Sequence, residues 1–338
     1  MQYYTNILEV IGNTPLVRIN NGCREGGPLL LAKLEFTNPG GSVKDRMASF
    51  ILRKAMAEGR LKKGDTVIDN TSGNTGVAVA MTAAVLGLKS ILTVPDKTSK
   101  EKIDLIKSFG AEVIVTPADA DHDDPRGCYM MAINLAKKHS YFHMNQYHNQ
   151  DNVQAHYLTT GPEIWGATDG RITHFVAGIG TGGTFSGTAK FLKEKNKDIR
   201  AIAVDPVGSI FSEWIRKRTM SKPEAYKVEG IGSDTVTEAL YPDLVDEVIT
   251  VKDSDAFETA RELAKTEGIS AGGSSGAAIW AARKIARKLN ADQIMVVMIP
   301  DSGMRYLSKC FNDSWMQQQG FMSNAGLATH TVSSGEQD

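Results

Sequence analysis

The chain has 338 residues, of which 41% are hydrophobic and 23% charged, a composition typical of a globular protein long enough to form two domains. Its 38 basic and 39 acidic residues leave a net charge of −1, so no basic excess favours binding to nucleic acid. The three cysteines are far apart in the sequence, which excludes a disulfide framework and a CxxC metal site and favours a reducing compartment.

The N-terminal segment shows no sign of export or membrane insertion. Residues 1–17, MQYYTNILEVIGNTPLV, lack a charged stretch followed by a continuous apolar run, so they do not predict a signal peptide. The longest apolar run, residues 77–88, is too short to cross a bilayer. We therefore expect a cytoplasmic protein that binds neither membrane nor nucleic acid.

The first predicted helix begins at a lysine. In NPGGSVKDR, residues 38–46, Ser42 is a good helix N-cap, and two glycines relax the backbone before it. Apolar residues then recur at helical spacing, at Met47, Phe50, Ile51 and Ala55. The first turn of a helix disfavours positive charge, so the position suits a lysine that is neutral or joined to a carbonyl carbon as an imine. A solvated lysine on a well-capped helix is the simpler alternative.

Short apolar runs then alternate with amphipathic stretches along the chain. The first block predicts strands at 65–69, 89–95, 111–117 and 141–146, with helices at 74–86, 99–110 and 127–138. The second block predicts strands at 173–180, 200–206, 246–253 and 293–301, with helices near 184–196, 254–267 and 275–289. Strands separated by such helices form parallel βαβ units. The sequence therefore predicts an α/β fold of two doubly wound domains facing across a cleft, with a disordered tail at 323–338.

Two glycine- and hydroxyl-rich turns follow predicted strands, at the sheet edge where ligands bind. TSGNTG, residues 71–76, offers hydroxyls, a carboxamide and free N–H groups that suit a carboxylate, although an elaborate helix cap would look the same. GIGTGGT, residues 178–184, offers backbone donors for a phosphate. It also matches the dinucleotide pattern GxGxxG through Gly178, Gly180 and Gly183, with Asp205 after the next strand. Close packing alone would explain these glycines as well.

A third turn, AGGSSGAA at 271–278, can present the hydroxyl of Ser274 to a ligand or use it as an N-cap. Together the chain offers a lysine at a helix start, a carboxylate cradle, a phosphate cradle and a hydroxyl. A nicotinamide enzyme has no need for the first two. An enzyme using pyridoxal 5′-phosphate (PLP) needs all four, because its lysine forms a Schiff base and its amino-acid substrate brings a carboxylate.

These residues resemble the cysteine synthase/cystathionine β-synthase family of fold-type II PLP enzymes, which share the fold of the tryptophan synthase β subunit. The resemblance runs over nearly the whole chain apart from the tail, through IGNTPLV, NPGGSVKDR, TSGNTG, GIGTGGT, EGIG, GGSSGAA and IPDS. It is nearest to the catalytic core of the cystathionine β-synthases. It implies a large PLP-binding domain of residues 1–41 and 147–322 and a smaller, mobile domain of residues 42–146.

The resemblance also implies a role for individual residues. Lys44 would hold PLP and move protons, Asn74 would contact its ring oxygen, and Ser274 would face its pyridine nitrogen. The phosphate would be bound by Gly180, Thr181, Gly182, Gly183 and Thr184. The substrate would be bound by Thr71, Ser72, Thr75, Gln146, Tyr147 and Gly230, the first four of them holding its carboxylate. No metal site is implied.

The reaction implied is β-replacement in sulfur amino-acid biosynthesis. A neutral hydroxyl at the ring nitrogen makes the ring a weaker electron sink, which favours rapid loss of a β-substituent. Lys44, displaced by the substrate amine, would remove the α-proton, and a thiol would then add. Tyr147 stands where sulfide-using cysteine synthases have phenylalanine. This favours homocysteine as the acceptor, cystathionine as the product and a role in transsulfuration. Sulfide as acceptor, giving cysteine, is the alternative, and either enzyme could release hydrogen sulfide.

Other features limit these expectations. The chain shows neither tandem regulatory domains nor a haem-ligating Cys/His extension, so we expect neither haem nor activation by adenosyl nucleotides. Serine, O-acetylserine and O-phosphoserine all stay open as donors, and a homodimer is expected from the family. Two other readings are an NAD-dependent oxidoreductase using residues 178–183 and Asp205, and a non-enzymatic regulatory protein that keeps PLP for structure.

Overall fold

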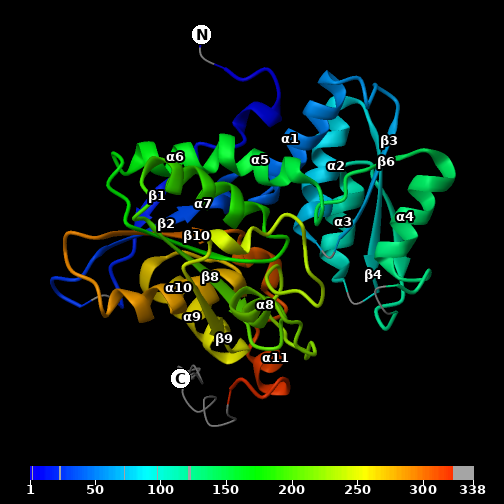
Figure 1. Cartoon of the computed structure of the whole chain (residues 1–338). Helices are drawn as coiled ribbons and strands as arrows, with labels where there is room; N and C mark the ends of the chain where they lie inside the picture. The colour runs from blue at the N-terminus through cyan, green and yellow to red at the C-terminus, as the bar shows by residue number, and fades with distance from the viewer. Residues whose placement is uncertain (2, 23, 72, 97, 121–122, 323–338) are drawn as a thin grey trace, which may run out of the picture.

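The computed structural model describes residues 1, 3–22, 24–71, 73–96, 98–120 and 123–322 (Figure 1). The tail at 323–338, for which disorder was predicted, lies outside the described residues, as does Ser72. The described chain forms two sheets, each accompanied by helices. Together with the family assignment reported below, this arrangement confirms the predicted α/β class.

The larger sheet has six strands in the order β1-β2-β10-β7-β8-β9. In this spatial order the strands are Leu16–Arg18, Leu29–Leu34, Ile294–Ile299, His174–Gly178, Arg200–Pro206 and Glu247–Val251. Strand β1 runs antiparallel to β2, and the other neighbouring pairs are parallel. The central strand β10 has the sequence IMVVMI and is buried throughout, as expected for a parallel strand covered on both faces.

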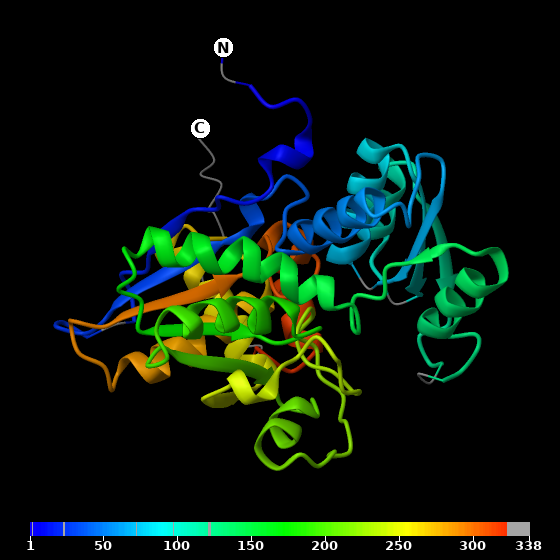
Figure 2. The same cartoon turned by 45° about the horizontal axis from the view of Figure 1, so that its top comes forward.

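The smaller sheet has four parallel strands in the order β5-β4-β3-β6. These strands are Glu112–Thr116, Lys89–Pro95, Thr66–Asn70 and Phe142–His143. The two views show this sheet and its helices as a separate lobe beside the larger sheet (Figures 1 and 2). We propose that the two sheets mark the two domains, and the exact domain boundaries stay a prediction.

Helices complete both units. The smaller unit contains α1 (Lys44–Ala57), α2 (Asn74–Leu86), α3 (Lys100–Ser108) and α4 (Cys128–His139). The larger unit contains α5 (Gln150–Leu158), α6 (Thr160–Ala167), α7 (Gly183–Lys195), α8 (Phe211–Lys217), α9 (Asp253–Glu267), α10 (Gly273–Ala286) and α11 (Asp313–Gln318). Short 3-10 helices are η1 (Ile7–Val10), η2 (Glu35–Thr37), η3 (Pro242–Leu244) and η4 (Gly303–Tyr306).

The helices cover the larger sheet on both faces. One apolar core joins the sheet to α9 and α10, and another joins its opposite face to α6, α7 and α8 (Figure 1). A third core packs α1 and α2 against β3 and β4 and includes Ala155 of α5. The turn at 71–76 follows β3 of the smaller sheet and the turn at 178–184 follows β7 of the larger one, so each lies at the carboxyl edge of its own sheet, where ligands bind.

Several elements differ from the sequence prediction. No strand was predicted at β1 or β2, and no helix at α8 or α11. The strand expected at 141–146 spans only Phe142–His143, because Asn145 has φ +51° and turns the chain. Residues 150–167, for which no element was predicted, form α5 and α6. The helix that begins at Lys44 has Val43 rather than Ser42 at its N-cap, although Oγ of Ser42 accepts a hydrogen bond from the Lys44 N–H at 3.3 Å.

Candidate active site

A cavity open to solvent lies where the start of α1 meets the loop after β7. Several of the predicted site residues contribute to its walls: Lys44, Gly180, Thr181, Gly182, Thr184 and Gly230. Apolar residues complete the lining, among them Val43, Phe185 and Met298. Other predicted residues, including Asn74, Gln146 and Ser274, are not part of this lining.

Lys44 is the first residue of α1, and its position is fixed by the strand-like segment beside it. The N–H of Val43 donates to the carbonyl of Pro300 at 2.8 Å, and Ser42 forms an isolated bridge with Asp301. Burial lowers the pKa of the Lys44 amine, while the negative charge of Asp301 raises it, and burial is the larger effect. The amine is therefore easier to deprotonate than that of a lysine in water.

The loop between β7 and α7 needs glycine for close approach. A Cβ on Gly180 would lie 2.5 Å from the carbonyl oxygen of Gly230. A Cβ on Gly182, whose φ is +94°, would lie 2.6 Å from Leu240. The loop leads into the N-terminus of a 13-residue helix, whose first N–H groups have no partner inside the helix. Such an end, with the hydroxyls of Thr181 and Thr184, suits a phosphate.

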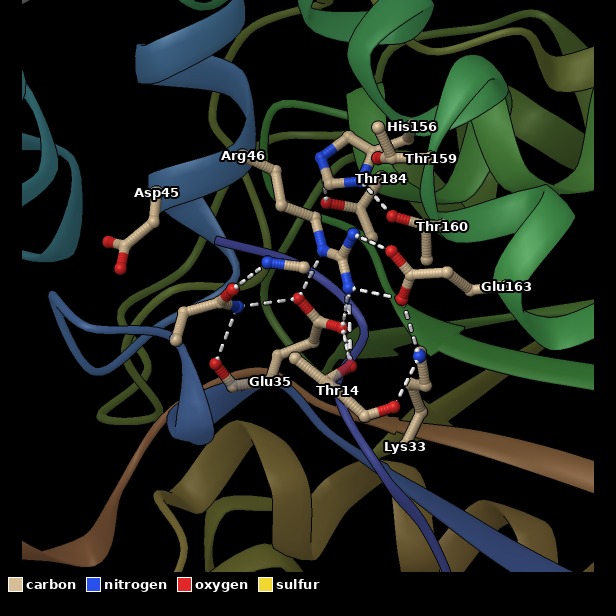
Figure 3. A network of polar contacts seen from close by, with 12 residues as sticks. Thr14, Lys33, Glu35, Asp45, Arg46, His156, Thr159, Thr160, Glu163 and Thr184 are labelled. Atoms are coloured by element: carbon tan, nitrogen blue, oxygen red, sulfur yellow. Dashed lines mark hydrogen bonds and ion pairs between the residues drawn. The ribbon is translucent and has the colours of Figure 1, made fainter. Parts of the chain in front are cut away.

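Helix α5 supports this loop from behind. Nδ2 of Asn152 donates to Oγ1 of Thr181 at 3.0 Å and to the carbonyl of Gln146 at 2.9 Å. Four residues later, the ring of His156 lies 3.1 Å from Oγ1 of Thr184 and 2.8 Å from Oγ1 of Thr160 (Figure 3). Burial, followed by the charge of Arg46, lowers the pKa of His156 to about 3, so the ring is neutral. The sequence analysis missed both residues, because it predicted no helix here.

The predicted carboxylate-binding residues form a second polar group. Oγ1 of Thr71 accepts hydrogen bonds from the N–H groups of Gly73 and Gly76, each at 3.1 Å, and keeps its own proton to donate. Oγ1 of Thr75 donates to Oε1 of Gln146 at 2.7 Å. The turn at 71–76 and Gln146 are therefore adjacent, as a shared ligand would require. Ser72, predicted to belong here, lies outside the described residues.

Three other predicted positions have defined surroundings. Ser274 is buried in the first turn of α10, whose N-cap is Gly272, so Ser274 is not the N-cap. Burial raises the pKa of the Tyr147 hydroxyl, and the charges of Asp69 and Asp234 add to this, so the hydroxyl is a proton donor at neutral pH. Oδ2 of Asp205 accepts from the N–H of Ser212 at 2.8 Å and is not part of the cavity lining.

A buried ion network is centred on Arg46, two residues after Lys44 in the chain (Figure 3). The guanidinium of Arg46 binds Glu35 through Nε at 2.6 Å and Glu163 through Nη1 at 2.7 Å. Nζ of Lys33 binds Glu163 at 2.7 Å. Two cations thus balance two carboxylates, and the network joins the first turn of α1 to β2 and α6. It was not predicted from the sequence, because its members lie up to 130 residues apart.

In the part of the chain that the structure describes, no cluster of histidine, cysteine and carboxylate side chains is arranged to hold a metal ion. Among the same residues, no helix has the length and apolarity that a membrane crossing requires. In the described residues, the candidate binding groups are therefore the cavity wall and the polar side chains around it.

Comparison with known proteins agrees with this geometry. The model of the family "Pyridoxal-phosphate dependent enzyme" matches residues 7–301. Cystathionine beta-synthase of Mus musculus is 44% identical over 94% of this chain and 57% of its own length. An O-acetylserine dependent cystathionine beta-synthase of Bacillus subtilis (strain 168) is 42% identical over 91% of this chain and 98% of its own length.

Two further matches carry other names. A cysteine synthase of Staphylococcus aureus (strain Mu50 / ATCC 700699) is 40% identical over 90% of this chain and 95% of its own length. The crystal structure of an O-ureido-L-serine synthase superposes with a TM-score of 0.85 at 34% identity, covering 94% of this chain and all of that one. The chain spans somewhat more than half the length of the mammalian relatives it matches.

Proposed function

Because the chain belongs to the family of pyridoxal-phosphate dependent enzymes, with PLP as its cofactor, we propose that it catalyses β-replacement on L-serine or an O-activated serine. In this proposal L-homocysteine is the acceptor and L-cystathionine the product. Cysteine synthesis from O-acetylserine and sulfide is the alternative, and it has support from the cysteine synthase relative. Family membership argues against the NAD-dependent reading, as does the engagement of Asp205 by helix α8.

The observation that carries the proposal is the cavity in which Lys44 faces a glycine loop at a helix N-terminus. PLP needs an amine for its aldehyde and a cradle for its phosphate, and this one cavity offers both. Gly180 and Gly182 have no space for a side chain, which brings the backbone donors of the loop to the cavity surface. The residues therefore fit the cofactor.

When bound, PLP supplies an electron sink that makes the α-proton of an amino-acid substrate acidic and allows a β-substituent to leave. We assign the proton transfer to the Lys44 amine, whose lowered pKa provides the neutral base. In this proposal the N–H groups of residues 180–184 would hold the phosphate, and the hydroxyl of Ser274 would face the ring nitrogen. Asn74 would donate to the ring oxygen.

The substrate carboxylate is assigned to the group formed by Thr71, Thr75 and Gln146, with Ser72 as a further expected contact. These side chains are already oriented before substrate arrives, because Oγ1 of Thr71 accepts from the N–H of Gly73 and Oγ1 of Thr75 donates to Oε1 of Gln146. This reduces the entropy lost on binding. Gly230, with φ +85°, lies at the cavity wall and would contact the substrate without a side chain in the way.

The choice of acceptor depends on Tyr147 in this proposal. Its hydroxyl stays protonated at neutral pH and so can donate to the carboxylate of homocysteine, a group that sulfide lacks. The names of two relatives, both cystathionine beta-synthases, support this choice. Its placement in transsulfuration, a cytoplasmic location and a homodimer belong to the same proposal.

Product analysis tests the proposal. The PLP-loaded protein is incubated with serine, O-acetylserine or O-phosphoserine, each with homocysteine or sulfide, and products are quantified by mass spectrometry. We expect cystathionine to form faster than cysteine, and no product from Lys44→Ala. Faster formation of cysteine would identify a cysteine synthase, and no product from any pair would refute β-replacement.

A further inference from the structure

The side chain of Asn74 is held at both ends. Its Nδ2 donates to Oδ2 of Asp301 at 2.7 Å, and its Oδ1 accepts from Nη1 of Arg305. Nη2 of Arg305 donates to the carbonyl of Gly40, four residues before Lys44. One arginine thus ties the lysine-bearing loop to the residue that begins α2.

The two partners fix which way the carboxamide of Asn74 faces. A guanidinium only donates hydrogen bonds, so it must meet the amide oxygen, and an ionised carboxylate only accepts, so it must meet the amide nitrogen. Rotating the amide by half a turn would pair donor with donor and acceptor with acceptor. One hydrogen on Nδ2 stays available for another acceptor oxygen.

Both partners are anchored on the larger unit. Asp301 follows β10, is 1% exposed, and accepts a second hydrogen bond from the hydroxyl of Tyr306 at 2.6 Å. Arg305 lies on η4, which begins two residues after Asp301. Asn74, in contrast, begins a helix of the four-stranded sheet unit. Residues of the larger unit therefore orient a side chain, that of Asn74, which belongs to the smaller unit.

We propose that Arg305 and Asp301 are positioning residues that orient the Asn74 carboxamide, so that its remaining N–H meets the ring oxygen of the cofactor. This inference rests on the cofactor contact proposed above for Asn74. Arg305 touches no reacting atom in this account, and it acts through Asn74 and the Gly40 carbonyl. The orientation of the ring in the cavity, rather than the strength of the phosphate contacts, is what it controls.

The test measures the cofactor itself. Arg305→Met, Arg305→Lys and the control Arg287→Met, which removes the exposed arginine at the C-cap of α10, are purified without cofactor and titrated with PLP. We expect Arg305→Met to weaken PLP binding roughly ten-fold and to change the visible circular dichroism of the bound cofactor. Arg305→Lys restores part of both properties, because it keeps a donor but lacks the fork that reaches two oxygens. Arg287→Met leaves both unchanged.

A double-mutant cycle with Asn74→Ala decides between outcomes. If Arg305 acts through Asn74, Arg305→Met has little further effect on binding or dichroism in the Asn74→Ala protein. Additive effects, or an Arg305→Met protein that matches the control, would overturn the inference. If Asn74→Ala alone changes neither property while Lys44→Ala abolishes the visible band, the assigned role of Asn74 is wrong and the inference falls with it. Asp301→Asn, checked for folding by thermal denaturation, is expected to alter the dichroism in the same direction as Arg305→Met.

Discussion

Replacing Arg46 by methionine removes the central cation of the buried ion network that it forms with Glu35, Glu163 and Lys33. Arg46 makes hydrogen bonds of 2.6 to 2.8 Å to the carboxylates of Glu35 and Glu163. The side chain of Glu35 is 0% exposed and that of Glu163 is 16% exposed. Without Arg46, Lys33 is the one cation of the network left to balance both carboxylates.

The expected loss follows from the burial of these charges. Removing one partner of a buried ion pair costs about 3–5 kcal/mol of unfolding free energy, because the remaining charge is neither hydrated nor paired. With an unfolding entropy of about 2.1 cal/mol/K per residue, a loss of about 4 kcal/mol lowers the melting temperature of a chain this long by about 6 °C. Methionine fills the space, so packing adds little to this figure.

The loss also depends on pH in a defined direction. Burial alone would raise the pKa of Glu163, but Arg46 and then Lys33 overcome this and lower it to about 2. In the wild type this carboxylate therefore adds stability above its unfolded pKa, near 4.5, that is lost as pH falls toward 2. In Arg46→Met burial is opposed less, so the folded pKa rises and this contribution to stability shrinks. The difference between variant and wild type is thus larger at pH 8, where the wild-type contribution is complete, than at pH 3.5, where part of it is lost.

Thermal and urea denaturation at pH 3.5 and pH 8, with saturating PLP, measure this difference. The double variant Arg46→Met/Glu163→Gln leaves Lys33 and Glu35 as a balanced pair. It should lose at least about 1 kcal/mol less than the sum of the single losses. A loss below about 1 kcal/mol in Arg46→Met, a deficit independent of pH, or additive single effects would refute the reasoning.

Three further predictions follow from the site. His156, kept neutral by burial with a pKa of about 3, binds a proton more readily in the unfolded chain, so stability falls by roughly 2–3 kcal/mol between pH 7 and 4.5. In urea unfolding, the free energy of unfolding of His156→Asn should decline less between pH 7 and 4.5 than that of the wild type. An equal decline in both proteins would count against this. Gly180→Ala places a Cβ 2.5 Å from the Gly230 carbonyl and should weaken PLP binding at least ten-fold in titrations. Gly166→Ala, with open space around the new Cβ, serves as its control, and equal affinities for PLP would contradict the account. Tyr147→Phe should lower kcat/KM for homocysteine roughly ten-fold or more and spare sulfide, measured by product formation. Equal losses with both thiols would reject the assignment of Tyr147.

Local sequence signals predicted most of the fold. The alternation of apolar runs and amphipathic stretches indicated both parallel sheets, because buried parallel strands such as 294–299 are continuously apolar. The glycine-rich turn at 178–184 indicated the cavity wall, because close backbone approach requires glycine. Strands β1 and β2 and helices α8 and α11 were missed, and so were helices α5 and α6. Their residues show no such regular alternation, and their boundary at Thr159 carries neither glycine nor proline.

The supporting contacts of the site were beyond reach from the sequence. Arg305 meets Asn74 across 231 positions of the chain, and Arg46 meets Glu163 across 117. Nothing in the local sequence distinguishes these arginines from solvated ones, since their burial is set by tertiary packing. Asp301 was within a quoted motif, IPDS, but its partner could be identified only once β10 and α2 were placed together. Long-range pairing, rather than residue type, was the missing information.

The central claim is that this cavity binds PLP through Lys44 and replaces a β-substituent of serine or its esters. The most direct measurement is the visible spectrum of the PLP-loaded protein during addition of a serine-type donor and then homocysteine. The account predicts a visible band that is absent in Lys44→Ala, is replaced when the donor is added, and returns when homocysteine is added, with cystathionine formed. A protein with no visible band after incubation with PLP, or with a band that no donor changes, would contradict it.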